Sequence, residues 1–168
     1  MIEVLPYTKD HAQGVVSVIL PIQQLEFGVP ITLEAQPDLM DIPGFYQTQA
    51  GNFWVALDHG RDDATDVGTV VGTIGLLDIG NGQAALRKMF VAASHRGSAH
   101  GVAKRLLDVL LDWSAAHGLA EIFLGTTDKF LAAHRFYEKN QFTEVPRAEL
   151  PAAFPVMAVD SKFYCRRL

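Results

Sequence analysis

A glycine-containing segment, Arg96-Gly97-Ser98-Ala99-His100-Gly101, separates two stretches of the chain that have different hydrophobic periods. Before it, Ala84 to Val91 has the composition of a strand. After it, apolar residues recur at three- and four-residue steps from Val102 to Trp113, which is the period of an amphipathic helix. The chain is therefore expected to pass from a strand, through a short loop, into a helix whose first N–H groups lie free beside the loop.

A strand that leads through glycines into a helix is a common phosphate site, because free N–H groups and the positive end of the helix dipole meet there. Gly97 and Gly101 let the backbone approach a ligand, Ala103 keeps the first helical turn uncrowded, and Arg96 adds a charged donor. No Gly-Lys-Ser/Thr follows, which argues against an ATP or GTP site. Gly80 to Ala85 matches a dinucleotide fingerprint formally, but it lies where a hairpin is expected and not at a helix start.

The other helices and strands are predicted from the same two hydrophobic periods. Asn81-Gly82 predicts a tight hairpin, because both central positions of a type I′ turn need a positive φ, which Asn and Gly adopt readily. A polar turn is expected at 59–66, and one short helix between loops at 27–50. Strand, helix, strand, helix in the middle, with antiparallel strands around them, indicates an α+β fold with a mixed, mainly antiparallel sheet flanked by helices. We expect strands at Ile2–Tyr7, Phe53–Leu57, Thr69–Leu77, Ala84–Val91, Glu121–Thr126, Phe142–Val145 and Phe163–Arg166, and helices at Thr8–Glu26 (ended or kinked by Pro21), from Val102 to His117-Gly118, and from Thr127 or Asp128 to Asn140.

Composition narrows the class of protein. With 168 residues, 49% hydrophobic and 20% charged, the chain is expected to form one domain over residues 1–168. The net charge of -5 equals the balance of residues 1–50, which hold six acidic side chains and one lysine, and this disfavours a nucleic-acid surface. The acidic residues are interpreted as solvated helix faces, with attraction of a cationic partner such as an amine as the alternative. No apolar run reaches about 20 residues and no signal peptide is visible, so we expect a cytoplasmic protein without a membrane partner. Cys165 is the only cysteine and no Cys/His cluster has zinc spacing, so no metal is expected and Cys165 is interpreted as an inert strand residue.

A second segment, Leu131 to Phe142, reads Leu-Ala-Ala-His-Arg-Phe-Tyr-Glu-Lys-Asn-Gln-Phe. Strand, phosphate loop, helix, strand and then this segment, in that order, resembles the Gcn5-related N-acetyltransferase (GNAT) superfamily, most clearly from Phe53 to Phe142. In that family an Arg/Gln-x-x-Gly-x-Gly/Ala loop grips the CoA pyrophosphate, and a later helix carries a Phe-Tyr-Glu-Lys-Asn-Gly-Phe-like segment. The resemblance implies an acetyl-CoA-dependent N-acetyltransferase that moves the acetyl group directly to a primary amine of a small molecule or peptide.

Matched residue by residue, Gly101 and Ala103 are the last two small residues of the family's loop motif. Ser98 stands where the family usually has Arg or Gln, and the arginine comes two residues earlier, at Arg96. Gln141 stands where the family has a glycine after Asn140. Asn140 can itself adopt the left-handed conformation that ends a helix, so the helix end is still expected there. The cofactor-binding residues that the resemblance implies are Met89, Phe90, Val91, Arg96, Gly97, Ser98, His100, Gly101, Val102 and Ala103.

The resemblance also implies a mechanism, in which Tyr137 is the general acid that protonates the departing thiolate. A phenol with an ordinary pKa of about 10 is protonated at neutral pH and can donate. Backbone N–H groups of Met89–Val91 are expected to polarise the thioester carbonyl while the pantetheine arm lies along that strand. The sequence does not identify a general base, and the alternatives Glu34, Asp38, Asp41 and Asp78 stay open.

Two other functions remain open from the sequence: a catalytically silent acyl-CoA-binding or sensing module, and a nucleotide-binding regulator. The acceptor is expected to be chosen by the variable segments 27–50 and 147–160, and dimers are common in the family, so a homodimer is one assembly that the resemblance allows. Isolated histidines and both tryptophans are interpreted as structural residues. These are His95, His134, Trp54 and Trp113.

Overall fold

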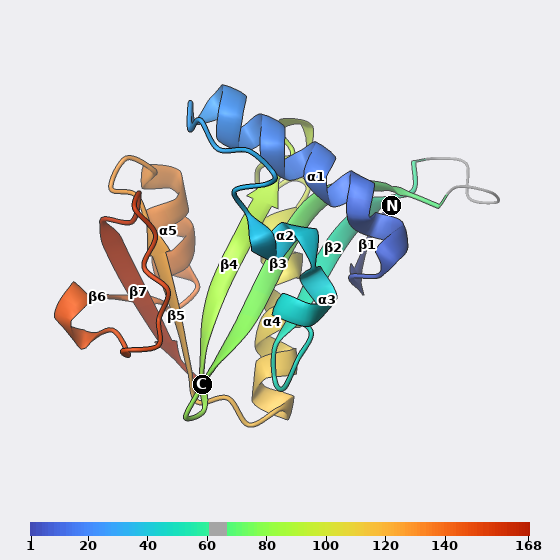
Figure 1. Cartoon of the computed structure of the whole chain (residues 1–168). Coiled ribbons are helices and arrows are strands. Elements are labelled where there is room, and N and C mark those ends of the chain that lie inside the picture. The colour runs from blue at the N-terminus through green and yellow to red at the C-terminus, as the bar shows by residue number, and fades with distance from the viewer. Residues whose placement is uncertain (61–66) are drawn as a thin grey trace.

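The computed structural model describes residues 1–60 and 67–168, so most of the turn expected at 59–66 lies outside the described residues. Seven strands form one sheet in the order β1-β2-β3-β4-β5-β7-β6 (Figure 1). Every strand expected from the sequence is present, which confirms the α+β class. The strands are β1 (Ile2–Pro6), β2 (Asn52–Asp58), β3 (Thr69–Gly80), β4 (Gln83–Val91), β5 (Glu121–Thr126), β6 (Thr143–Val145) and β7 (Lys162–Arg167).

Strands β1 to β4 form an antiparallel meander, and β5, β7 and β6 form a second antiparallel group. The β3–β4 turn is the predicted hairpin, since Asn81 has a φ of 57° and Gly82 a φ of 70°. The two groups meet at β4 and β5, which pair in parallel. A parallel pair needs a crossover connection, and helix α4 (Val102–Ala116) supplies it.

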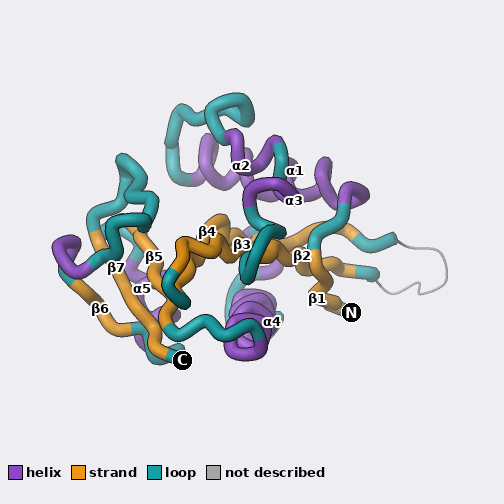
Figure 2. Tube along the Cα trace, turned by 60° about the horizontal axis from the view of Figure 1, so that its bottom comes forward, coloured by secondary structure: helices purple, strands orange, loops and turns teal. Residues whose placement is uncertain are grey.

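The helices cover both faces of the sheet (Figure 2). Helices α4 and α5 lie on one face, and α1, α2 and α3 lie on the other. Short helical turns join several elements. The remaining bounds are α1 (Ala12–Pro21), α2 (Pro37–Met40), α3 (Ile42–Phe45) and α5 (Leu131–Lys139), with 3₁₀ turns η1 (Lys9–His11), η3 (Ala93–His95) and η4 (Arg147–Glu149), and a π-helical turn η2 (Ile22–Glu26).

The helix predicted from Thr8 to Glu26 changes type at its proline. Pro21 is the last residue of α1, and the chain continues as the π-helical turn η2, in which the N–H of Phe27 bonds to the carbonyl of Ile22 at 3.0 Å. Proline has no N–H to donate, so the regular hydrogen-bond ladder cannot pass through it unchanged. The stretch 27–50 holds two short helices, α2 and α3, where one was expected.

Helix α5 differs from its prediction at both ends. It begins at Leu131, after a turn in which Phe130 N–H bonds to Thr127 O at 3.3 Å, so neither Thr127 nor Asp128 caps it. At the other end Gln141, and not Asn140, adopts the left-handed conformation, with φ values of 70° and -99° respectively. Gln141 N–H bonds to Glu138 O at 3.2 Å, and Phe142 N–H bonds to Tyr137 O at 3.0 Å. These two bonds form a Schellman motif, so the helix has a regular C-terminal cap without the glycine.

The sheet separates three apolar clusters. The largest packs against α4 and α5 and includes both Trp54, which is 1% exposed, and Tyr137. A second cluster lies under α1–α3, and a small third cluster, which includes Cys165, lies under the segment between β6 and β7. Burial raises the pKa of the Cys165 thiol to about 11, which favours the unreactive protonated form. Over residues 1–60 and 67–168, no helix has the length and apolar character needed to cross a membrane.

Candidate active site

Strands β4 and β5 separate soon after they meet. Their pairing covers three residue pairs, from Gln83–Glu121 to Ala85–Phe123. Beyond that point β4 continues to Val91 and β5 to Thr126, and the two strands diverge like the arms of a V (Figure 1). In the described chain, the edge of β4 from Leu86 to Val91 therefore has no neighbouring strand on the β5 side. An open strand edge of this kind can accept an extended ligand as an additional strand.

A β-bulge interrupts β4 at this opening. Thr73 of β3 pairs with Phe90 and Gly75 pairs with Arg87, so two residues of β4 oppose one residue of β3. Lys88 lies in the bulge with a φ of 52°, which is uncommon for a residue with a side chain, and Thr73 Oγ1 donates a hydrogen bond to its carbonyl at 2.7 Å. Bulges of this kind redirect side chains and are frequent beside functional sites.

The predicted phosphate loop lies between the end of β4 and the start of α4. Gly97 has a φ of 98° and Gly101, the N-cap residue of α4, a φ of 62°, so both need the left-handed region. No side chain caps α4, and a Cβ built on either glycine would meet nothing within 4 Å. The first N–H groups of α4 thus face an open space that a phosphate could enter.

Arg96 holds this loop to two other elements. Its Nε donates to Val91 O at 2.8 Å, and its two Nη atoms bind both carboxylate oxygens of Glu26, at 2.6 and 2.8 Å. This bidentate pair lowers the pKa of Glu26 and joins the loop to the end of η2. The sequence suggested Arg96 as a phosphate ligand but did not suggest Glu26 as its partner, which is 70 residues away in the chain.

The loop histidines differ in their surroundings. A ring nitrogen of His95 lies 2.7 Å from Asp58 Oδ2, and this bond is the main reason that the pKa of Asp58 falls to about 2. The His100 ring is tilted by 46° against the His95 ring, with ring centroids 5.5 Å apart, and Ser98 is exposed. His95 is therefore a structural residue, as interpreted from the sequence. On α5, His134 is also buried, with a ring nitrogen 2.8 Å from Thr127 O.

Tyr137 lies on α5, across the opening from β4. Its hydroxyl is 4.0 Å from Met89 Sδ, so the structure brings together two residues that the sequence had placed in the site. Burial raises the pKa of Tyr137 to about 12, which keeps the phenol protonated. Within the described chain a thioether, which is a weak acceptor, is the only hydrogen-bond partner of this hydroxyl, so its proton is available to another group.

The end of α5 sets the position of Tyr137. Phe142 N–H bonds to Tyr137 O at 3.0 Å, and the two rings pack with centroids 5.7 Å apart. Tyr164 of β7 packs on the same ring at 5.8 Å and donates its own hydroxyl to Glu138 at 2.7 Å. The side chain of Tyr137 is thus fixed from two sides.

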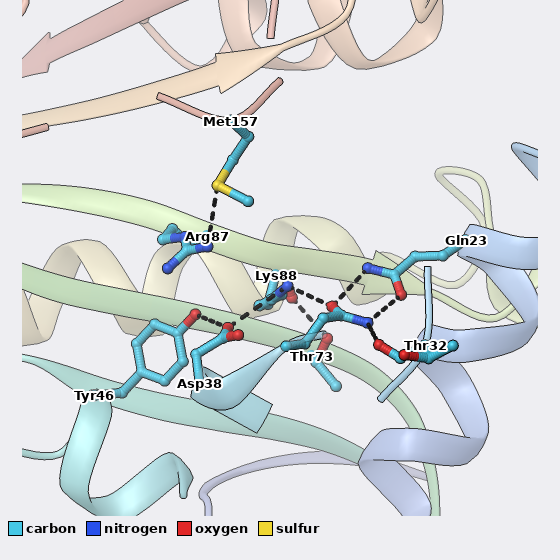
Figure 3. A network of polar contacts seen from close by, with 9 residues as sticks. Gln23, Thr32, Asp38, Tyr46, Thr73, Arg87, Lys88 and Met157 are labelled. Carbon is cyan, nitrogen blue, oxygen red and sulfur yellow. Dashed lines mark hydrogen bonds and ion pairs between the residues drawn. The ribbon is translucent and has the colours of Figure 1, made fainter. Parts of the chain in front are cut away.

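A buried polar network lies on the α1–α3 side of β4 (Figure 3). Lys88 Nζ donates to Gln36 Oε1 at 2.7 Å and lies 3.5 Å from Asp38 Oδ2, which also accepts the hydroxyl of Tyr46 at 2.6 Å. Gln36 and Gln23 exchange two amide hydrogen bonds, at 2.9 and 3.0 Å. Burial lowers the pKa of Lys88, which Asp38 partly offsets. We call the set of Gln23, Gln36, Asp38, Tyr46 and Lys88 the bulge network.

Of the four acidic residues considered as a base, the structure places only Asp38 beside the bulge. Glu34 is exposed. Asp41 caps α3 by accepting from Gly44 N–H at 3.0 Å. Asp78 accepts from the N–H groups of Ala50 and Gly80, at 3.1 and 2.8 Å, and so closes loops at the other end of the sheet.

Comparison with known proteins identifies the family. Residues 19–142 match the model of the acetyltransferase (GNAT) family, which is well over half of the chain. The chain belongs to the GNAT acetyltransferase family. An acetyltransferase of this family from Staphylococcus aureus Mu50 superimposes with a TM-score of 0.89 at 36% identity, over 99% of both chains. A Streptococcus agalactiae acetyltransferase superimposes with a TM-score of 0.88 at 28% identity, over 99% of this chain and 98% of the other.

Curated GNAT relatives are longer proteins. The chain is 35% identical over 112 residues to the N-acetylaspartate synthetase of Xenopus tropicalis, a match that covers 64% of this chain but 37% of that protein. It is 31% identical to N-acetyltransferase family 8 member 2 of Rattus norvegicus, covering 64% and 45% respectively. The chain therefore spans less than half the length of these relatives. A Thermoplasma acidophilum PaiA N-acetyltransferase, solved with coenzyme A, shares the GNAT fold with a TM-score of 0.71 at 15% identity, over 100% of this chain and 99% of that one.

Proposed function

We propose that this GNAT protein is an acetyl-CoA-dependent N-acetyltransferase that moves the acetyl group directly to a primary amine of a small molecule or peptide. The observation that carries the proposal is the position of the Tyr137 hydroxyl, 4.0 Å from Met89 Sδ across the opening between β4 and β5. An open strand edge, a protonated buried phenol and a glycine loop at a helix start lie around one opening, which is what acyl transfer from CoA requires.

The loop and the strand edge would hold the cofactor. Gly97 and Gly101 leave open space in front of the first turn of α4, where the N–H groups of Val102 and Ala103 would bind the pyrophosphate. The edge of β4 from Met89 to Val91 would pair with the amide groups of the pantetheine arm and polarise the thioester carbonyl. Ser98 and His100 are exposed at the rim of the same loop and complete the proposed cofactor site together with Arg96 and Phe90.

The transfer step needs one proton at the sulfur. The neutral amine of the acceptor attacks the thioester carbonyl carbon, a C–N bond forms, and the C–S bond breaks. Tyr137 donates its proton to the departing sulfur, and its pKa of about 12 ensures that the proton is present over the whole neutral range. The nitrogen loses one proton to solvent as the amide forms, and the Tyr137 phenolate takes up one proton from solvent, so the protons balance over the cycle.

The direct test mixes the protein with acetyl-CoA and a panel of amines and follows the release of free thiol. The panel includes aspartate and glutamate, because relatives are named for the synthesis of N-acetylaspartate and a GNAT neighbour at 15% identity is an N-acetylglutamate synthase from Neisseria gonorrhoeae. We expect at least one amine to accelerate thiol release well above the rate without amine. Binding of acetyl-CoA with no acceleration by any amine would instead support the silent binding module, and ATP or NAD binding without competition by CoA would support a nucleotide-binding regulator.

A further inference from the structure

Arg87 projects from β4 next to the bulge, between the two segments that the sequence marked as acceptor-selecting. Its guanidinium lies 5.6 Å from the centre of the Phe45 ring in α3, and its Nη2 lies 3.5 Å from Met157 Sδ in the segment between β6 and β7 (Figure 3). The preceding residue, Leu86, belongs to the apolar cluster on the opposite face of the sheet. Arg87 therefore lies on the α1–α3 side of β4, the same side as the bulge network.

Within the described residues, the guanidinium of Arg87 has no carboxylate partner. Its two neighbours are a thioether and an aromatic face, neither of which neutralises a full positive charge. Two other cations of the site are paired, the buried Lys88 with Asp38 and the exposed Arg96 with Glu26. A half-buried arginine whose planar fork is left without an anion is suited to bind one from solution.

Asp160, in the segment between β6 and β7, is an acidic residue that interacts electrostatically with Arg87. Its Oδ2 accepts the N–H of Met157 at 2.9 Å, and no ion pair with Arg87 forms within 4.0 Å among the described residues. Burial raises the pKa of Asp160, and the charges of Arg87 and Arg147 act in the opposite direction. Lys88 and Asp38 pair with each other, so no carboxylate among the described residues is in direct contact with the donor fork of Arg87.

We propose that Arg87 binds a carboxylate of the acceptor, so that the acceptor is an amino acid or a small amine that carries a carboxylate close to its nitrogen. This inference rests on the proposed acetyltransferase function and names its substrate class. Arg87 and Met89 are the two neighbours of Lys88 in the bulge of β4, so both lie at the point where the open edge begins. A carboxylate held by Arg87 places a nitrogen two or three bonds away toward the open edge of β4, where the thioester carbonyl would lie.

This proposal refines the alternative, drawn from six acidic residues in 1–50, of a cationic partner such as an amine. Of those six, Asp38 is the one that reaches the bulge, and Lys88 already pairs with it at 3.5 Å. Among the described residues, the cation on this side of β4 without a direct carboxylate contact is Arg87. A zwitterion supplies the amine that the reaction needs together with the anion that Arg87 lacks.

The test compares matched acceptors that differ only in the carboxylate: aspartate, glutamate, alanine and leucine against their α-amides, and aspartate against asparagine. With the wild-type protein, at least one acid form is expected to exceed its amide in kcat/KM by about tenfold or more, the size of a lost charge-assisted hydrogen-bond pair. Arg87→Gln should remove this preference by raising the KM of the acid, while the KM of acetyl-CoA stays unchanged. Arg87→Lys should restore part of it.

Arg167→Gln is the matched control, because the Arg167 side chain is 87% exposed at the end of β7 and pairs with Glu121, away from the bulge. It should keep the acid preference. A second readout, calorimetric titration of each acid and amide into the protein saturated with CoA, does not depend on turnover. If no amine releases thiol, the acetyltransferase proposal fails, yet acid binding that Arg87→Gln abolishes still supports the carboxylate site. Equal kcat/KM for acids and amides, no acid binding, or a preference that survives Arg87→Gln overturns it.

Discussion

The open edge of β4 and its α1–α3 side form two regions of one site, and they are built in different ways. The edge depends on backbone conformation. Its pairing with β5 is short, and a bulge at Lys88 and a loop with two left-handed glycines follow each other along one continuous stretch of chain. The other side depends on side chains, and the bulge network gathers them from residues 23 to 88. The first region is therefore expected to determine cofactor binding, and the second to determine stability and acceptor choice.

The largest effect that separates the two regions should come from Asp38→Ala. This change leaves the buried ammonium of Lys88 without its carboxylate and Tyr46 without its acceptor, which should lower the free energy of unfolding by about 3 kcal/mol. Urea unfolding measures it. The control is Asp108→Ala, which breaks an exposed pair with Lys104 and should cost less than about 0.5 kcal/mol. Equal losses in the two variants would show that the bulge network does not stabilise the fold.

Tyr137→Phe tests the chemistry at the open edge. Loss of the general acid should lower kcat about a hundredfold, equivalent to about 2.7 kcal/mol, and leave the affinity for acetyl-CoA nearly unchanged. The control Tyr164→Phe removes the hydroxyl of a neighbouring buried tyrosine that bonds to Glu138 and should leave kcat within a factor of about two. An unchanged kcat for Tyr137→Phe would exclude this residue from the chemistry.

The pH dependence of kcat provides a second check on Tyr137. A general acid acts in its protonated form, so activity is present below its pKa and is lost as the pH rises through it. Because burial raises the pKa of Tyr137 to about 12, its deprotonation should not reduce kcat below pH 11. A loss of kcat centred near pH 9, present in wild type and absent from Tyr137→Phe, would contradict the buried position.

Gly101→Val should weaken CoA binding about tenfold, since its side chain enters open space in front of α4 that a phosphate would occupy. It also forces a branched residue into a left-handed conformation, at a cost of about 1–2 kcal/mol of stability. Gly118→Val separates the two effects, because Gly118 has a φ of 76° with open space around it at the other end of the same helix. Both variants are expected to lose similar stability, and only Gly101→Val is expected to bind CoA more weakly. Equal CoA affinity in the two variants would show that the phosphate does not bind beside Gly101.

The smallest effect should come from Glu26→Gln. It releases the guanidinium of Arg96 from its bidentate carboxylate and should tighten CoA binding by about threefold, more at low salt than at high salt. Calorimetric titration with CoA at two salt concentrations measures this. Weaker binding in Glu26→Gln would mean that Glu26 positions Arg96 for the cofactor and does not compete for it.

The sequence predicted the elements whose signals are local. The Asn81-Gly82 hairpin, the helix that follows Gly101 and the strand at Glu121–Thr126 depend on turn chemistry and hydrophobic period, which neighbouring residues carry. The start of α5 was predicted wrongly, and the left-handed residue at its end is Gln141 and not Asn140. Both ends make contacts with a distant segment that the local sequence does not show: Asp128 N–H donates to Ser161 Oγ at 2.9 Å, and Arg166 Nη1 donates to Asn140 O at 2.6 Å.

The candidate site divides along the same line. Tyr137 and Met89 were predicted from motif positions, and the structure brings them within 4.0 Å. No short-range pattern links Glu26 to Arg96, or Asp38 to Lys88, since each pair joins elements that meet only after the sheet has formed. The surroundings of Arg87 were not predicted for the same reason, because Phe45 and Met157 approach it from segments far apart in the chain.

The short ladder between β4 and β5 also has a mechanical meaning. Three residue pairs at one end hold the two halves of the sheet together, so the hydrogen-bonded sheet has a hinge-like seam that runs through the site. A ligand that pairs with β4 as an additional strand would add hydrogen bonds along the open edge and stabilise the contact between the two halves of the sheet. The free protein should accordingly exchange the backbone amide hydrogens of residues 86–91 and 124–126 faster than the CoA-bound protein, and ligand binding and resistance to heat should rise together.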